Sequence, residues 1–251
     1  MAGLQARHSP AWGEAPGLPN QNGRSPVGAK PFRCSTRAFN HLEVLLIVAA
    51  VSILALLLVP TLLKAKAKQE RIRCASHLKQ IGLAHKVFAT DHTNLVTGLE
   101  EFPARTSTNS GGSLEYVGTG NVGRHYQAMS NELGSAVVLV CPADKSRFMR
   151  RDFVIPMTNG NVSYSVGVDG SELTPNVIVA SDWNMVSTFP RRHGILELTS
   201  SNVVSWGPQL HRTVGNVALS DGSVQQCTSN GLWQLALQSF RELETNRLEF
   251  P

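Results

Sequence analysis

Residues 38–60 read AFNHLEVLLIVAAVSILALLLVP, an apolar run with one carboxylate near its start and one proline at its end. From Leu42 to Leu63 the run contains a single charged residue, Glu43, and the next charge is Lys64. About 20 apolar residues suffice to cross a bilayer as a helix. The sequence therefore predicts a membrane span that carries one acid. Such an acid is expected to have a function and a partner, because its burial costs roughly 2.5–3.5 kcal/mol or more.

The start of the run resembles the processing signal of type IV prepilins and type II secretion pseudopilins. In that family a prepilin peptidase cuts before a Phe, the new N-terminus is methylated, and a Glu four residues later pairs with a neighbouring subunit's terminal amine. Phe39 and Glu43 have this spacing, and Pro60 stands where the family helix usually has its proline. The resemblance implies cleavage between Ala38 and Phe39, N-methylation of Phe39, and assembly with other pseudopilin subunits through Glu43.

Three positions depart from the family pattern. Ala38 stands where Gly is usual, and Asn40 and His41 stand where Thr and Leu are common. We still expect cleavage, because Ala is small enough for a peptidase pocket. Basic residues occur on both sides of the span, at 30–37 and at 64–73, so a cytoplasmic leader and a periplasmic head follow from the resemblance and not from charge.

Two simpler interpretations of the span remain open. A secretory signal has an apolar core of about 7–15 residues close to the N-terminus, which fits this run poorly, although residues 65–67 have the A-x-A form of a cleavage site. A plain single-pass anchor would have the same hydropathy without a role in assembly. The prepilin interpretation is favoured because it also accounts for the acid and the proline.

Composition limits the remaining classes of function. A length of 251 residues suits one globular domain plus an anchor, and the net charge is +5. Much of the positive charge lies in the leader and in residues 64–79, directly after the span. Bases in that position meet inner-membrane lipid headgroups or acidic filament partners, so we expect no nucleic-acid partner.

The chain divides into four segments by texture. Residues 1–38, rich in Gly, Pro, Ser and Asn, form the predicted leader peptide, residues 39–63 the membrane half of a helix, residues 64–92 its amphipathic half, and residues 93–251 a periplasmic head. One helix from about Asn40 to about Thr90 is predicted, with a kink at Pro60. Residues 93–135 are predicted as long loops.

The head has the pattern of an antiparallel sheet closed by a helix. Asp221-Gly222 predicts a two-residue hairpin turn in which both residues favour positive φ. A terminal helix is predicted over Leu232–Leu243. The fold class is therefore α+β and pilin-like, with the amphipathic half-helix packed on the sheet. The predicted strands are Ala136–Val140, Ser163–Val168, Val177–Ala180, Val203–Trp206, Val217–Ser220 and Ser223–Cys227.

Several head segments resemble a pseudopilin-like family of Verrucomicrobia and related bacteria. Residues 74–80 (CASHLKQ) are similar to its C-x-x-N-L-K-Q helix motif, with His77 in place of Asn, and residues 141–144 (CPAD) to its C-P-x-D turn. Residues 161–169 and 180–184 resemble two further blocks. His211, nine residues and then Asp221-Gly222 match its C-terminal hallmark.

Four cysteines occur, Cys34, Cys74, Cys141 and Cys227. Cys34 would leave with the leader, so one disulfide and one free thiol are expected in an oxidising periplasm. The spacing does not decide the pairing. Cys74–Cys141 is preferred because both lie in segments that resemble relatives.

Catalytic and metal-binding interpretations have less support. His211, Asp221 and Ser220 or Ser223 have the residue types of a hydrolase triad, but there is no G-x-S-x-G elbow and the turn explains Asp-Gly. Calcium needs about six or more oxygens, and the candidate acids are scattered singly. We therefore expect no enzyme activity, no cofactor and no metal. The acids are Asp169, Glu172, Asp182 and Asp221.

The sequence thus predicts a membrane-anchored pseudopilin-like structural subunit of a type II secretion or type IV pilus-like filament in a bacterial inner membrane. The alternative is a membrane-anchored periplasmic module that binds a polysaccharide or a protein. In that alternative, Trp183, Trp206 and Trp233 would supply a stacking surface, although tryptophans in a small domain more often belong to the core.

Overall fold

The computed structural model describes residues 40–93, 101–244 and 246–251. The predicted leader, the cleavage site Ala38–Phe39, the methylated Phe39 and Cys34 lie outside the described residues. The chain consists of two compact units, the first ending at Val51 and the second running from Ser52 to Pro251.

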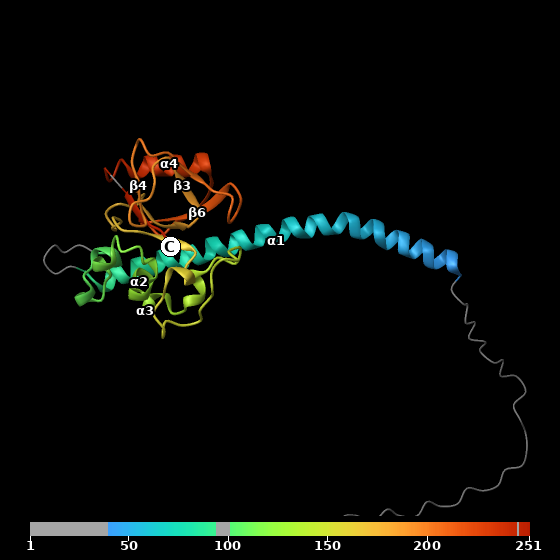
Figure 1. Cartoon of the computed structure of the whole chain (residues 1–251), viewed down its shortest axis with the longest axis horizontal. Coiled ribbons are helices and arrows are strands. Elements are labelled where there is room, and N and C mark those ends of the chain that lie inside the picture. Colours follow the sequence, from blue (N-terminus) through green and yellow to red (C-terminus); the bar gives the residue numbers. More distant parts are fainter. Residues whose placement is uncertain (1–39, 94–100, 245) are drawn as a thin grey trace, which may run out of the picture. The chain divides into compact units, whose positions relative to one another are not determined.

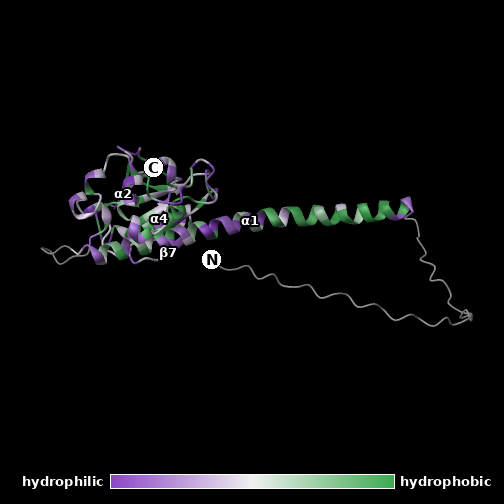
Figure 2. Cartoon of the chain, turned by 90° about the horizontal axis from the view of Figure 1, so that it is seen from below, coloured by the Kyte–Doolittle hydropathy of each residue, from purple (hydrophilic) through white to green (hydrophobic). Residues whose placement is uncertain are grey.

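The predicted long helix is confirmed as α1 (His41–Asp91), and it continues without interruption through Pro60. In the first unit all the described residues, 40–51, are exposed and most are apolar. In the second unit exposed apolar residues continue to Leu63, and charged residues follow (Figure 2). An 18-residue window of α1 has a mean hydropathy of 3.0 and no buried residue, so the helix is long and apolar enough to cross a membrane.

The second half of α1 has an apolar stripe that the head buries. Its buried residues recur at intervals of three and four, as expected for one face of a helix packed on a core. Lys and Arg alternate with this stripe and remain at the surface. The buried residues are Cys74, Leu78, Ile81, Gly82, Ala84, His85, Phe88 and Ala89.

The centre of the head is a six-stranded antiparallel sheet in the order β4-β8-β1-β2-β6-β7. A separate two-stranded antiparallel sheet joins β3 and β5. The strands are β1 (Tyr164–Gly167), β2 (Ile178–Asp182), β3 (Met185–Ser187), β4 (Ile195–Leu198), β5 (Val204–Trp206), β6 (Val214–Leu219), β7 (Val224–Thr228) and β8 (Asn246–Glu249).

Each face of the large sheet carries its own core. Val179 and Ala218 point to the face shared with α1, whereas Ile178 and Val217 point to the face shared with α4 (Ser229–Ser239). This alternation is the period-2 pattern of strands buried on both faces. In Figure 1, α1 passes between the sheet and the segment that contains α2 and α3, while α4 lies on the far side of the sheet.

The segment between α1 and the sheet is more regular than predicted. Residues 93–135 were expected to be loops, but the described part contains α2 (Val122–Ala128), α3 (Ser130–Leu133) and three 3₁₀ turns, η1 (Pro103–Arg105), η2 (Thr108–Ser110) and η3 (Leu114–Tyr116). The predicted strand Ala136–Val140 is wrong, because residues 136–139 form a fourth 3₁₀ turn, η4 (Ala136–Leu139). A further turn, η5 (Asn159–Asn161), precedes β1.

Three strands were not predicted, and the terminal helix begins earlier than expected. Helix α4 covers Ser229–Ser239 instead of Leu232–Leu243, and the chain then returns as β8 into the middle of the large sheet. Strand β8 has the sequence Asn-Arg-Leu-Glu, in which only Leu248 is hydrophobic. Glu249 accepts from the backbone N–H groups of Gly118 and Gly120, whereas the buried side chain of Asn246 has no hydrogen-bond partner among the described residues, so this polar pattern does not predict a strand.

The Asp221-Gly222 hairpin joins β6 to β7 as predicted, but with a longer turn. Gly222 N–H donates to the Leu219 carbonyl at 2.9 Å, and Leu219 N–H donates to the Ser223 carbonyl at 2.9 Å. Gly222 has φ 80°, while Asp221 is not among the residues with positive φ. The loop therefore has three residues and only its glycine is left-handed, which corrects the predicted two-residue turn.

Gly222→Ala should destabilise the head by about 1–3 kcal/mol, because alanine resists φ 80° and its Cβ would lie 3.2 Å from Lys86 Cδ. Thermal melts of the full chain in detergent would measure the loss. Gly160→Ala is the matched control, since Gly160 has no positive φ and its added Cβ would meet only Thr158 Oγ1 at 3.6 Å. Equal stability of the two variants would contradict the assignment of strain to the turn.

Candidate functional site: motif residues beside helix α1

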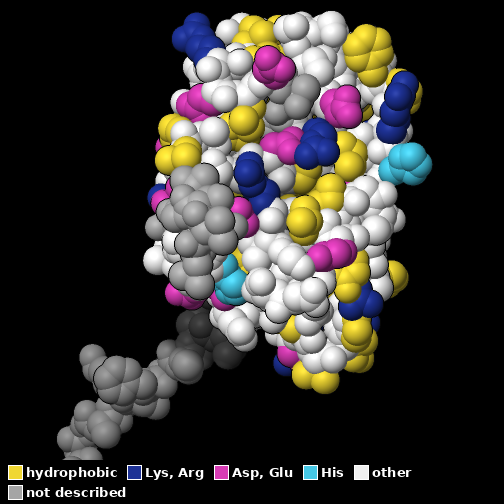
Figure 3. Space-filling model, turned by 90° about the vertical axis from the view of Figure 1, so that its left-hand side faces the viewer, with side chains coloured by type: hydrophobic (Ala, Val, Ile, Leu, Met, Phe, Trp, Pro, Cys, Tyr) yellow, Lys and Arg dark blue, Asp and Glu magenta, His cyan; other side chains and the backbone are white. Residues whose placement is uncertain are grey.

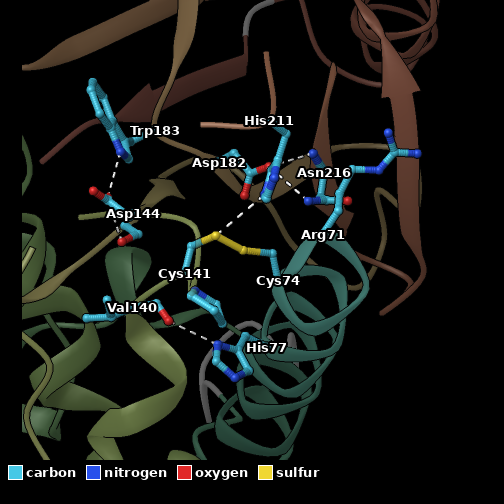
Figure 4. The surroundings of a disulfide bond; sticks show 12 residues. Arg71, Cys74, His77, Val140, Cys141, Asp144, Asp182, Trp183, His211 and Asn216 are labelled. Atoms are coloured by element: carbon cyan, nitrogen blue, oxygen red, sulfur yellow. Dashed lines mark hydrogen bonds and ion pairs between the residues drawn. A yellow bond between two sulfur atoms is a disulfide. The ribbon is translucent and has the colours of Figure 1, made fainter. Parts of the chain in front are cut away.

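The residues singled out by the head motifs come from separate segments and meet beside α1 (Figure 4). Cys74 of α1 and Cys141, which follows η4, form a disulfide with a Cα–Cα distance of 5.2 Å. Both cysteines are fully buried. This is the pair that the resemblance favoured. It links the helix covalently to the segment that packs on the opposite side from the sheet.

His77, which stands where the helix motif has Asn, reinforces the same junction. Its Nδ1 lies 3.1 Å from the Val140 carbonyl, next to the disulfide. Since a carbonyl only accepts, Nδ1 must carry the proton. Burial lowers the pKa of His77, so the neutral ring is favoured. The histidine thus replaces an amide donor without adding a charge.

His211 covers the disulfide from the side of the sheet. Its Nε2 lies 3.4 Å from Cys141 Sγ and 3.9 Å from Asp182 Oδ2. Burial lowers the pKa of His211, and the nearby Arg71 lowers it further. A neutral imidazole therefore packs between a disulfide and a carboxylate. These contacts favour a structural role for His211.

Asp182, at the end of β2, is the most constrained acid of the site. It is fully buried, and its Oδ2 accepts from the backbone N–H of Asn216 at 2.8 Å and from Asn216 Nδ2 at 2.9 Å. Its Oδ1 has no hydrogen-bond partner. Burial raises the pKa of Asp182 to about 7, although both bonds from Asn216 act in the opposite direction.

Asp144, in the turn of residues 141–144, differs from Asp182 because several donors surround its carboxylate. Its carboxylate accepts from Ser146 N–H at 2.9 Å, Ser146 Oγ at 2.6 Å, Ser163 Oγ at 2.8 Å and Trp183 Nε1 at 2.8 Å. Burial alone would raise the pKa of Asp144, but these donors outweigh it and the pKa is lowered. The charged carboxylate therefore ties its own turn to β1 and to Trp183.

The Asp221-Gly222 turn contacts α1 at a second place. Lys79 Nζ donates to the Gly222 carbonyl at 2.5 Å, and a Cβ built at Gly82 would lie 3.7 Å from Gly222 Cα. His211 and Gly222 flank β6. Gly222 contacts α1 at residues 79–82, and His211 contacts Cys141, the disulfide partner of Cys74. The segment from His211 to Gly222 therefore helps to dock the helix on the sheet.

The structure does not bring the imagined hydrolase triad together. His211 contacts Cys141 and Asp182, whereas the Asp221 carboxylate accepts from Ser223 N–H at 2.7 Å within the turn. A nucleophile, a base and an acid that act together must lie within hydrogen-bond reach of one another.

The candidate metal ligands are also committed elsewhere. Cys74, Cys141 and His211 place their ligand atoms within 4.8 Å of one another, but the two sulfurs are bonded to each other. Among the proposed calcium acids, Asp169 binds Arg247 and Glu172 lies 3.8 Å from Lys86. Asp182 and Asp221 bind Asn216 and the turn, so in the described residues these acids do not converge on a common point.

One buried network was missed by the sequence analysis. His125 of α2 places Nδ1 2.8 Å from Ser113 Oγ and Nε2 3.3 Å from Glu249 Oε2, and all three residues are fully buried. Glu249 also accepts from the backbone N–H groups of Gly118 at 3.1 Å and Gly120 at 2.8 Å. These are the residue types of a Ser-His-acid triad, but without access to solvent the network joins β8 to the loop before α2. Its members are up to 136 residues apart, and no local pattern announces them.

The three head tryptophans contribute to the cores. Trp206 is 4% exposed, and Trp183 and Trp233 are half-buried against the core on the α4 side of the sheet. On the face of the head drawn in Figure 3, the coloured hydrophobic side chains occur in small groups among Lys, Arg, Asp and Glu. Packing against the core thus accounts for part of each tryptophan side chain.

Two residues were predicted to act in assembly. Glu43 lies on the exposed first turn of α1, and Pro60 lies inside the helix. Within residues 40–93, 101–244 and 246–251 the Glu43 carboxylate has no hydrogen bond or ion pair. A partner for this acid, if it is buried in lipid, must come from elsewhere.

Removing the disulfide with Cys74→Ser and Cys141→Ser should lower the free energy of unfolding by roughly 4 kcal/mol, because the bridge closes a loop with a sequence separation of 67. Chemical denaturation of the full chain in detergent would measure it. Cys227→Ala is the control, since Cys227 is a free, half-buried cysteine, and its removal should cost clearly less, about 1 kcal/mol. A bridge to Cys227 in non-reducing peptide maps would contradict the pairing.

Asp182→Asn should flatten the pH dependence of stability. The pKa of Asp182 is raised in the folded chain to about 7 from an ordinary 3.8, so folding favours the protonated acid. This contribution is complete below about pH 4, falls by up to about 1.4 kcal/mol per pH unit as the pH rises, and is lost above about pH 7. Melts of both proteins across that range would test it, and identical slopes would show that Asp182 titrates normally.

No family model, curated protein or solved structure matches this chain. What the chain does is therefore inferred from its own residues. These residues form a helix whose first half is apolar and exposed. The second half is attached to an α+β head by the Cys74–Cys141 disulfide and by the turn that follows β6.

Proposed function

We propose that the protein is a membrane-anchored, pseudopilin-like structural subunit of a type II secretion or type IV pilus-like filament. A prepilin peptidase would cleave it between Ala38 and Phe39, and the new amine of Phe39 would be methylated. The subunit would lie in the bacterial inner membrane with its head in the periplasm, and would assemble with other subunits through α1.

The observation that carries the proposal is the contrast between the two halves of α1. Residues 42–63 are all exposed and almost all apolar, and an apolar surface of that length is stable only in lipid or against other apolar helices. One face of residues 74–89 is instead built into the core of the head. A single helix that is free at one end and fixed at the other suits a subunit that is first anchored in a membrane and then packed into a helical bundle.

Glu43 supplies the specificity that apolar packing lacks. Apolar helices in a bundle can slide past one another, because the contacts differ little between registers. A buried acid changes this, since an unpaired charge in an apolar environment is costly and one partner position relieves that cost. The amine at Phe39 of a neighbouring subunit, four residues before Glu43 in the sequence, would be such a partner.

The head would serve this assembly mechanically. A subunit pulled out of a membrane transmits force from its head to its helix, and the connection must not slip. The Cys74–Cys141 bridge and the Lys79–Gly222 bond hold two neighbouring turns of α1, and His211 contacts Cys141 at the bridge. The alternative function, a binding module, finds no support in the tryptophans, which belong to the cores.

Glu43→Gln should leave cleavage before Phe39 intact and reduce incorporation into filaments at least tenfold, because the substitution removes the charge but not the size of the side chain. The native host protein would be recovered from sheared filaments, with its N-terminal residue and methylation determined by mass spectrometry. Glu70→Gln is the matched control on the same helix, beyond the apolar segment.

Two results would contradict the proposal. An intact leader, or an N-terminus after Ala67, would exclude prepilin processing. Correct processing combined with normal assembly of Glu43→Gln would exclude charge pairing as the device that selects the neighbouring subunit.

A further inference from the structure

A groove lies where α1 leaves its apolar segment and approaches the head. It has a volume of about 610 Å³ and is formed by one side of α1, from Leu63 to Arg71, together with the loop of residues 210–214 before and at the start of β6. Its apolar wall consists of Leu63, Ala67, Ala143, Leu210 and Val214. All of these residues belong to the second compact unit.

The rim of the groove is strongly basic. Lys64, Lys68 and Arg71 are spaced four and three residues apart, which places them on one face of the helix, and Arg212 faces them from the loop. Glu70 is the acid among the lining residues. In the described chain none of the four bases lies within salt-bridge distance of a carboxylate, so their charge is available to a ligand.

The loop holds Arg212 at a cost. Arg212 has φ 63°, one of two non-glycine residues with positive φ in the described chain. Such a backbone conformation is unfavourable for a side chain with a Cβ, and it persists only where the surroundings impose it. The preceding residue, His211, is held by the disulfide and Asp182, so the same docking contact that fixes the loop also turns Arg212 to the rim.

The groove lies at a defined depth relative to the apolar segment. Lys64 is the first charge after Glu43, and Arg71 lies about 10 Å further along the helix axis. In a bilayer the polar headgroup layer is about 5–8 Å thick on each side of the hydrocarbon. If the apolar segment spans the membrane, the apolar wall meets the hydrocarbon boundary and the bases meet the headgroups.

We propose that this groove binds the headgroup and glycerol region of an anionic phospholipid, and the proposal rests on the membrane anchoring in the proposed function. The four bases would surround the phosphodiester, and the apolar wall would contact the glycerol and the first methylenes of the acyl chains. A free phosphate would make no use of that wall. A zwitterionic lipid would bring its cationic group close to four bases that outnumber the single acid of the groove, Glu70.

The test uses the full chain in a neutral detergent, titrated with short-chain phosphatidylglycerol, short-chain phosphatidylcholine or inorganic phosphate, with bound lipid counted by native mass spectrometry. Each basic side chain near an anionic surface contributes roughly fivefold in affinity. The wild-type chain should therefore bind phosphatidylglycerol at least about tenfold more tightly than phosphatidylcholine. Phosphate should not displace the lipid at comparable concentration.

Lys64→Gln with Lys68→Gln should reduce the affinity for phosphatidylglycerol about tenfold or more. The matched control is Lys66→Gln with Arg73→Gln, which removes the same charge from the same stretch of helix but from exposed positions outside the groove. Since all four side chains are exposed, both double variants should melt like the wild-type chain.

Three outcomes would overturn the proposal. Equal losses in the two double variants would show that diffuse charge, and not the groove, attracts the lipid. Displacement by inorganic phosphate would assign a site for small anions. Equal affinity for the two lipids would show that the groove does not select an anionic headgroup.

Insertion into phosphatidylcholine vesicles separates these results from the proposed function. A chain that inserts but shows no preference for phosphatidylglycerol would refute the groove alone. A chain that binds phosphatidylglycerol but does not enter filaments would refute the filament function and leave the groove. A chain that fails to insert would refute the membrane anchor on which both depend.

Discussion

The structure depends on the attachment of the second half of α1 to the head. That half-helix supplies one wall of the core on its face of the sheet, and the disulfide from Cys74 to Cys141 fixes it covalently to the chain on its other side. The apolar stripe of this half-helix packs in the core, and covalent and polar contacts fix its position further. Cys74, His77, Lys79 and Gly82 do so from consecutive turns, with partners in segments that are 63 to 143 residues away in sequence.

Much of the overall fold could be predicted because it follows from hydropathy and turn chemistry. The bounds of α1 are visible in the apolar run and in the spacing of the apolar residues after it. Strands β1, β2 and β6 are runs of mostly buried residues, and the Asp-Gly turn indicates the position of β7. Strand β8 could not be predicted in this way, since three of its four residues are polar and the partners of buried Glu249 are backbone N–H groups of a distant loop. The strand predicted over residues 136–140 was wrong although its residues are apolar and mostly buried. The apolar run Ala-Val-Val-Leu-Val is buried, but it is held by the neighbouring Cys141 bridge in a 3₁₀ turn and not in a sheet.

The residues of the candidate site were identifiable as a group only through resemblance, because no spacing rule connects position 74 with 141 or 211. Their roles come from the structure. The hallmark histidine is read in isolation as a catalytic group or a ligand, yet its surroundings are a disulfide and the carboxylate of Asp182. The Asp-Gly pair is read as a turn, and it is one, but its carbonyl also binds Lys79. The local sequence predicts neither the contacts of His211 nor the bond between Lys79 and Gly222, because both form only when distant segments meet in the folded head.

Four acids of the chain differ in how their carboxylates are satisfied. Asp144 is satisfied by four donors and remains charged, and Glu249 is satisfied by two backbone N–H groups and a histidine. Asp182 has donors on one oxygen only, and its pKa rises because protonation is the remaining way to reduce the cost of burial. Glu43 has none of these solutions among the described residues. Burial of this part of α1 in lipid or in a bundle would therefore require either protonation of Glu43 or a donor from outside the described residues, and the proposed pairing with a neighbouring subunit would supply such a donor.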